Sequence, residues 1–449
     1  MNEKAALFES GSYRRAVIRQ IAPAIAANMI SLVYNLADTW FVGLLNAPRQ
    51  TAAVTVVYPW FIMLTAVSNL FGVGGAACAA RALGRKSPGD AKEISAVSFW
   101  CGLAFSAVFV VLFALLMRPA LTVCGATEET YGYCFSYALY SVVMGGVFSS
   151  VSMLLANLVR SQGESFAASL GVSLGGVLNM ALDPFFILPR FLNMGVGGAG
   201  LATAISNVFS VAFFLIYIKV KRGGISLDPR LVKKGLRHVG SILRIGFPSA
   251  VQYALTVVAI AAQARFVSKY PTEALAAVGI IKKLDNLPIN FSIGAATGLL
   301  PLLAYNHAAG NGERFKKSFR FGVSIALGFA LICLAVYEVF APQLAYFFIK
   351  DAATVSYAAA FLRRMVVAMP LMSVCYAMII RFQAMGRARE SLIVSILRKG
   401  VIDIPLLFLM DAVQPLYGLM WVQPIVDFIA LSSAFILAKR IAKRTNHTK

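Results

Sequence analysis

The feature of this sequence that most restricts its fold is a series of long apolar runs. A helix that crosses about 30 Å of hydrocarbon needs roughly 20 mainly apolar residues. Alternating segments of the kind that build membrane barrels are absent, so each run is predicted to be a helix. The sequence predicts twelve spans, at approximately 17–45, 51–80, 94–117, 133–156, 166–188, 195–219, 241–268, 274–305, 317–342, 357–381, 391–411 and 415–438.

The composition supports a membrane location. Hydrophobic residues make up 59% of the 449 residues and charged residues only 13%, with a mean hydropathy of +0.75. Soluble domains carry about 25% charged residues, so this chain has too little polar surface to coat itself in water. Segments such as 102–116 are apolar on every face, which argues against a soluble helical bundle. We therefore predict an all-α integral membrane protein embedded in the lipid bilayer.

The net charge of +22 would suggest nucleic-acid binding in a soluble protein. Here about 29 of the 41 Lys and Arg residues fall in or beside the loops on the side of the N-terminus. By the positive-inside rule, we predict a plasma-membrane protein with both termini in the cytoplasm. Nucleic acid is not an expected partner, because the basic residues are spread over short loops without interleaved aromatic residues.

The two halves of the sequence resemble each other. A basic stretch at 219–240 separates six spans from six, and at an offset of about 225 Pro23 aligns with Pro248. We predict an N-lobe at 1–218, a cytoplasmic linker at 219–240 and a C-lobe at 241–449 with a basic tail. Because six spans is an even number, both lobes enter the membrane in the same direction. Two such lobes, related by a pseudo-twofold axis, create a central cleft suited to alternating access.

A small group of polar residues lies inside the apolar spans of the N-lobe. A carboxylate in the bilayer costs roughly 2.5–3.5 kcal/mol, so each one needs a partner, water or a proton. Five positions on three spans fall at one depth, roughly 6–12 Å below the outer boundary. They are Asp38, Asn179, Asp183, Ala199 and Thr203. We interpret them as a site for H⁺ or Na⁺; the alternative is that the two carboxylates only bind helix ends near the interface.

The C-lobe does not repeat this pair of carboxylates. The register places Gln263 opposite Asp38 and Ile404 opposite Asp183. Asp427 has no evident partner in the sequence. A second cation site in the C-lobe is therefore left open.

Other residues are weaker candidates for a role in transport. Pro23 precedes Asp38 in the same predicted helix, where it allows bending or simply fixes a kink. Four large side chains are candidates to line the substrate cleft, although such residues more often serve packing: Tyr34, Trp40, Phe148 and Met153.

Cysteine and histidine give no sign of catalysis or of a bound cofactor. The six cysteines mostly lie in apolar helices without a CxxC pattern, although Cys124 and Cys134 flank an outer loop and could pair. The three histidines, His238, His307 and His447, lie in loops or the tail. An enzyme is not expected.

Several motifs together resemble the multidrug and toxic compound extrusion (MATE) family of transporters, in its bacterial form. They are Tyr34 to Gly43 (YNLADTWFVG), Arg81 to Gly84 (RALG), Ser161 to Gly163 (SQG), Asn179 to Pro184 (NMALDP), Gly198 to Thr203 (GAGLAT) and Phe382 to Arg387 (FQAMGR). The resemblance covers essentially the whole chain. It implies twelve helices in two lobes and cation-driven antiport that exports amphipathic, often cationic compounds. The family's N-lobe coupling residues map onto the five positions above, with a backbone carbonyl from Ala199 and a bending point at Pro23.

The chain departs from the family pattern in its second lobe. Some branches of the family carry acidic coupling residues in the second lobe. This chain has no clear match for them, since span seven offers Gln252 and span ten has no carboxylate. The chain therefore looks like the branch with an N-lobe site only. We also expect the protein to be a monomer. A lipid-linked oligosaccharide flippase of related architecture is the alternative function; it should have a strongly cationic cleft and often fourteen spans.

Overall fold

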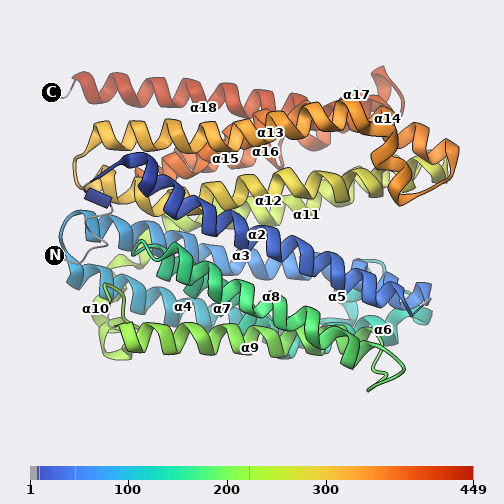
Figure 1. Cartoon of the computed structure of the whole chain (residues 1–449), viewed down its shortest axis with the longest axis horizontal. Coiled ribbons are helices and arrows are strands. Elements are labelled where there is room, and N and C mark those ends of the chain that lie inside the picture. The colour runs from blue at the N-terminus through green and yellow to red at the C-terminus, as the bar shows by residue number, and fades with distance from the viewer. Residues whose placement is uncertain (1–7, 10, 46, 222, 448–449) are drawn as a thin grey trace.

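The chain folds into a bundle of long helices that run roughly parallel to one axis (Figure 1). The computed structural model describes residues 8–9, 11–45, 47–221 and 223–447, and no β-strand occurs among them. The first and last described residues lie at the same end of the bundle, which we name the terminal end (Figure 1). The opposite end is named the distal end.

The first half of the chain forms one group of helices, drawn in blue to green in Figure 1. Its elements are α2 (Tyr13–Gly43), α3 (Pro48–Gly84), α4 (Pro88–Leu115), α5 (Met117–Val123), α6 (Glu128–Ala138), the π-helical η1 (Leu139–Met144), α7 (Gly146–Arg160), α8 (Ser165–Ile187) and α9 (Val196–Lys221).

A short helical stretch links this half to the second, which is drawn in yellow-green to red in Figure 1. The linking elements are η2 (Pro229–Leu231), α10 (Val232–Gly235) and η3 (Leu236–His238). The second half comprises α11 (Val239–Val267), α12 (Thr272–Ala308), α13 (Gly312–Phe348), α14 (Ala352–Met365), α15 (Ala368–Ala384), α16 (Ala388–Arg398), α17 (Asp403–Val413), η4 (Gly418–Trp421) and α18 (Val422–His447).

The helices account for the predicted spans, but three of the spans are divided between successive helices. Among the described residues, nine helices are long and apolar enough to cross a membrane, and two further spans are helix pairs bent by 44°. The bent pairs are α6 and η1 with α7, and α14 with α15. The eleventh predicted span, 391–411, is divided into α16 and α17 at residues 399–402.

Proline explains two of the three breaks. Pro370 and Pro405 each occupy the third position of the helix that follows a break, α15 and α17. A proline ring clashes with the carbonyl four residues earlier, so the helix cannot continue through that point. In the α16 and α17 break, Gly400 adds a residue with little helix preference. The remaining bend follows η1, whose wider turns disturb the α-helical ladder.

The two lobes are packed together at the terminal end. The most extensive contacts between them join α3 to α11 and α2 to α12. The backbones approach so closely that a Cβ atom at Gly246 of α11 would overlap the carbonyl of Leu70 on α3. Gly298 of α12 also lies tightly against Gln20 and Ile21 of α2. We name this terminal-end contact between the lobes the seam.

Toward the distal end, the cores of the two lobes separate. The largest buried cluster contains residues of both lobes, such as Leu154 and Leu302. Beyond it, one cluster contains only first-half residues, such as Val42 and Tyr137, and another only second-half residues, such as Val267. The lobes thus share a core at the terminal end and have individual cores at the distal end.

The link between the lobes is docked on α4. Trp100 Nε1 donates to the carbonyl of Leu227 at 3.0 Å, and the Ser95 hydroxyl bonds the backbone of Ser226. Arg237 Nη2 lies 2.8 Å from Asp90 Oδ1 and 2.9 Å from Glu93 Oε2. The link is therefore held against the first lobe.

Candidate functional site

Three helices of the first lobe bring the predicted polar residues together. Asp38 lies on α2, Asn179 and Asp183 on α8, and Thr203 on α9. The Asn179 amide donates to Asp183 Oδ1 at 3.4 Å and to Thr203 Oγ1 at 3.3 Å. Asp38 and Asp183 interact electrostatically across the gap between α2 and α8. We name these four side chains the acidic cluster.

The acidic cluster is closed to solvent and has unused acceptors. Asp38 is 8% exposed, Asn179 2% and Asp183 0%. One oxygen of each of these side chains, Asp38 Oδ1, Asn179 Oδ1 and Asp183 Oδ2, has no hydrogen-bond partner among the residues that the structure describes. Leaving a buried acceptor unpaired costs about 1–3 kcal/mol, and more when it is charged. Two carboxylates with spare oxygens in low dielectric are therefore suited to hold a shared proton or a small hard cation.

The cluster sits near the distal ends of its helices. Asp38 is five residues before the end of α2, Asp183 is four before the end of α8, and Thr203 is seven after the start of α9. At 1.5 Å per residue these positions lie about 6–11 Å inside the helix ends. This agrees with the shared depth predicted from the sequence.

Ala199 and Tyr137 lie beside the acidic cluster. The Ala199 carbonyl, predicted as a ligand, accepts the Thr203 hydroxyl at 3.0 Å. Tyr137 of α6 is buried and interacts electrostatically with both Asp38 and Asp183. Sequence reasoning missed Tyr137, because an aromatic residue in an apolar span resembles a packing residue. The one clue to its role, the π-helical turn that begins two residues later, is a property of the backbone.

The other predicted residues are not members of the acidic cluster. Helix α2 runs without a break through Pro23. The Tyr34 ring packs on α8, where it would crowd a Cβ atom at Gly176. Trp40 is 60% exposed and contacts Phe41, Phe148 is exposed, and Met153 is half-buried. No hydrogen bond links these four side chains to the acidic cluster within the described part of the chain.

The second lobe contains a different buried network. Arg398 Nε donates to Asp427 Oδ1 at 2.8 Å, and Gln423 donates to Asp427 Oδ2 at 2.9 Å. The Arg398 guanidinium also lies over the Tyr376 ring, 4.1 Å from its centroid. Asp427, which had no evident partner in the sequence, is therefore paired. Because this network has its own cation, it does not duplicate the acidic cluster.

Two further groups contain residues of the kinds that form disulfides or bind metals. Cys124 and Cys134 are both free thiols. Asp90, Glu93 and His238 have ligand atoms within 4.8 Å of one another at the terminal end. Arg237 already bonds both of those carboxylates, so the group acts as an ion-paired clasp for the link between the lobes.

Comparisons with known proteins identify relatives along the whole chain. The MatE family model matches residues 23–185 and again residues 248–409. A multidrug export protein MepA of Staphylococcus saprophyticus is 28% identical over 443 residues, covering 99% of this chain and 97% of that protein. The MepA protein of Staphylococcus aureus strain MRSA252 is 27% identical with the same coverage.

Solved structures share the fold. An outward-facing multidrug resistance MATE family transporter of the MOP superfamily has 25% identity and a TM-score of 0.89, with 99% of each chain covered. A crystal structure of MATE in complex with MaD3S has 24% identity and a TM-score of 0.90, covering 99% of this chain and 100% of that chain. These matches confirm the predicted all-helical, two-lobed membrane fold.

The two family matches also agree with the internal repeat. They begin at Pro23 and Pro248, the two prolines that the alignment of the halves superimposes. Together they cover more than half of the chain. The resemblance noted in the sequence is thus confirmed, and the chain belongs to the MatE family of membrane transporters.

Proposed function

We propose that this protein is a multidrug efflux antiporter of the plasma membrane, driven by H⁺ or Na⁺, with both termini in the cytoplasm. Its substrates are amphipathic, often cationic compounds that bind between the lobes. Relatives described as multidrug export proteins support the direction of transport and the substrate class. The positive charges concentrated on the terminal side support the orientation.

The acidic cluster is the observation that carries the proposal. Two buried carboxylates face each other with spare oxygens, and no Lys or Arg of the described chain forms an ion pair with either one. A proton or Na⁺ bound there would relieve the repulsion between Asp38 and Asp183. Carboxylate and amide oxygens suit either ion, so the choice between H⁺ and Na⁺ is a matter for experiment.

Helix α2 connects the ion site to the contact between the lobes. Its distal half carries Asp38, while its terminal half packs through Ile21 and Ile25 against Gly298 and Gly294 of α12. A change in how Asp38 is held can therefore displace the part of α2 that forms the seam. Pro23 lies within this contacting stretch, where the missing N–H allows the helix to bend.

The conformation fits one state of an alternating-access cycle. With the termini in the cytoplasm, the seam closes the inner side, and the separate distal cores leave the lobes free to part on the outer side. The acidic cluster lies near that outer side, where external cations would enter. We assign this structure to the outward-facing state.

The test uses purified protein in proteoliposomes, with a proton gradient and a Na⁺ gradient imposed separately. Ethidium is the fluorescent substrate, and the variants are Asp38→Asn and Asp183→Asn. We expect one of the two gradients to drive ethidium transport by the wild type and both variants to lose that drive. The matched control is Glu273→Gln, which removes a carboxylate from the first turn of α12. Gradient-driven transport by Asp38→Asn at the wild-type rate would refute the coupling role.

A further inference from the structure

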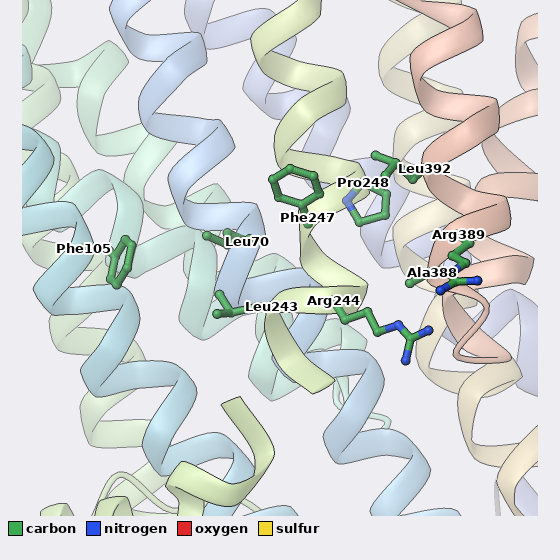
Figure 2. Close-up of a pocket in the computed structure, with 9 residues that line it drawn as sticks. All are labelled: Leu70, Phe105, Leu243, Arg244, Phe247, Pro248, Ala388, Arg389 and Leu392. Atoms are coloured by element: carbon green, nitrogen blue, oxygen red, sulfur yellow. The ribbon is translucent and has the colours of Figure 1, made fainter. Parts of the chain in front are cut away.

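A groove lies on the outer surface of the seam, between the two lobes. It has a volume of about 460 Å³ and lies between α3 and α4 of the first lobe and α11 and α16 of the second (Figure 2). Its apolar wall includes Leu70 and Phe105 from one lobe and Phe247 and Leu392 from the other. Phe105 and Phe247 are each about half exposed, at 53% and 51%. In a membrane, such side chains face lipid.

Two arginines line the terminal side of this groove. Arg244 is the sixth residue of α11 and Arg389 the second residue of α16, so both lie within about two helical turns of the terminal ends of their helices. In Figure 2 the Arg244 side chain extends from α11 toward α16, and the Arg389 side chain lies along α16 on the facing wall. Neither guanidinium has a hydrogen bond or ion pair within the described part of the chain. Two exposed cations thus stand next to an apolar channel without a protein counter-ion.

We propose that the groove binds an anionic phospholipid. The lipid phosphate lies between Arg244 and Arg389, and an acyl chain follows Leu70, Phe105 and Phe247 toward the centre of the membrane. Guanidinium groups bind phosphate oxygens through paired hydrogen bonds, and basic pockets between membrane helices select acidic headgroups. A bilayer offers acyl chains to any apolar groove, and every phospholipid has a phosphate, but only an acidic headgroup supplies a net negative charge to balance two arginines.

The position of the groove gives the lipid a regulatory role. Its walls come from both lobes, and they stay together only while the seam is closed. A ligand that binds one of two conformations shifts the population toward it. The bound lipid therefore stabilises the state with the terminal end closed. This second step rests on the proposed alternating access, whereas lipid binding itself does not.

Native mass spectrometry of the purified protein tests the binding step. Phosphatidylglycerol and phosphatidylcholine with identical acyl chains are titrated against the wild type and against Arg244→Gln/Arg389→Gln. We expect the wild type to prefer phosphatidylglycerol. The double variant should lose about thirtyfold in affinity for it, since each basic residue near an anionic surface contributes a factor of about five to binding. The control is Lys316→Gln/Arg320→Gln, which removes two exposed positive charges from α13 near the terminal end; it should bind as the wild type does. Equal binding of the two lipids, or the same loss in the control pair, would overturn the proposal.

A distance measurement tests the regulatory step without any transport assay. Spin labels at Lys92 and Lys443, on exposed terminal-end positions of α4 and α18, report the spacing of the lobes in nanodiscs. Phosphatidylglycerol should enrich the closed distance in the wild type but not in the arginine double variant. If that variant loses lipid binding yet shows the wild-type response, the regulatory role is wrong. Because neither experiment uses a substrate or an ion gradient, failure here is distinct from failure of the antiport proposal.

Discussion

Arg398 and Asp427 form an ion pair sealed inside the second lobe. Arg398 ends α16 at the break before α17, and Asp427 belongs to α18, so the pair ties a broken span to its neighbour. The side chains are 2% and 0% exposed. Both charges have lost their hydration, so the pair depends on close, well-aligned hydrogen bonds to offset that cost.

Removal of one partner should destabilise the protein strongly. Asp427→Asn or Arg398→Met leaves a buried charge without its counter-ion, which costs about 3–5 kcal/mol. Thermal unfolding in detergent should therefore show a marked fall in transition temperature for each single variant. The double variant Arg398→Met/Asp427→Leu should recover much of that loss, since it buries no lone charge. A double variant as unstable as the sum of both single variants would show that the pair is not coupled in this way.

Thr203 should tune ion affinity without abolishing transport. Its hydroxyl accepts from Asn179 and donates to Ala199, so Thr203→Val keeps the shape of the side chain and removes both bonds. A hydrogen bond contributes about 0.5–1.5 kcal/mol, so the loss of even one should raise the half-saturating ion concentration about twofold to twelvefold. Thr203→Ser, which retains the hydroxyl, is the matched control. Initial transport rates across a range of ion concentrations measure both, and an unchanged value for Thr203→Val would remove Thr203 from the site.

Substitution of Gly246 should open the seam. Even the single methyl group of Gly246→Ala overlaps the Leu70 carbonyl, so the lobes cannot approach as closely at the terminal end. The distance between labels at Lys92 and Lys443 should then shift to longer values, with transport reduced. Gly279→Ala is the control, because a Cβ there has no neighbour within 4 Å among the described residues although Gly279 also lies in α12, a second-lobe helix that contacts the first lobe. A distance distribution identical to the wild type would show that the seam tolerates side chains.

The clasp on α4 should become a metal site when its cation is removed. Arg237→Ala leaves Asp90, Glu93 and His238 with ligand atoms within 4.8 Å, a spacing and ligand set that suit Zn²⁺. We expect Zn²⁺ to raise the unfolding temperature of the variant and to leave the wild type unchanged. The variant Arg237→Ala/His238→Ala should lose the response. Stabilisation of the wild type to the same degree would mean that Arg237 does not occupy the site.

The sequence predicted the span positions and the acidic cluster because both depend on local rules. Hydropathy places a span, and a count of residues from its end places Asp38, Asp183 and Thr203 at one depth. The twofold match of the family model confirms the repeat that the paired prolines suggested. These inferences required no knowledge of how the helices turn about their axes.

The features that were missed depend on how helices face one another. Asp427 had no evident partner in the sequence because Arg398 lies 29 residues away on another span, and no local pattern shows which helix faces meet. The span at 391–411 was predicted to be interrupted at Pro405, and the structure places the break just before that proline, at residues 399–402, where the apolar composition matches that of the rest of the span. Tyr137 was missed because its hydroxyl, at the end of an apolar ring, acquires a role only when the packing of α6 against α3 and α9 brings it near Asp38 and Asp183.

The unequal charge of the two lobes determines where a membrane voltage can act. In the second lobe Arg398 travels with Asp427, so a movement of that pair carries no net charge through the field. In the proposed cycle the empty acidic cluster is negative, and a bound cation cancels part of that charge. Moving one elementary charge across the membrane is worth about 2.3 kcal/mol per 100 mV. An inside-negative voltage therefore holds the ion-free carboxylates toward the outside, so the voltage itself favours the return of the ion-free transporter, with its bound substrate, to the side where its next ion arrives.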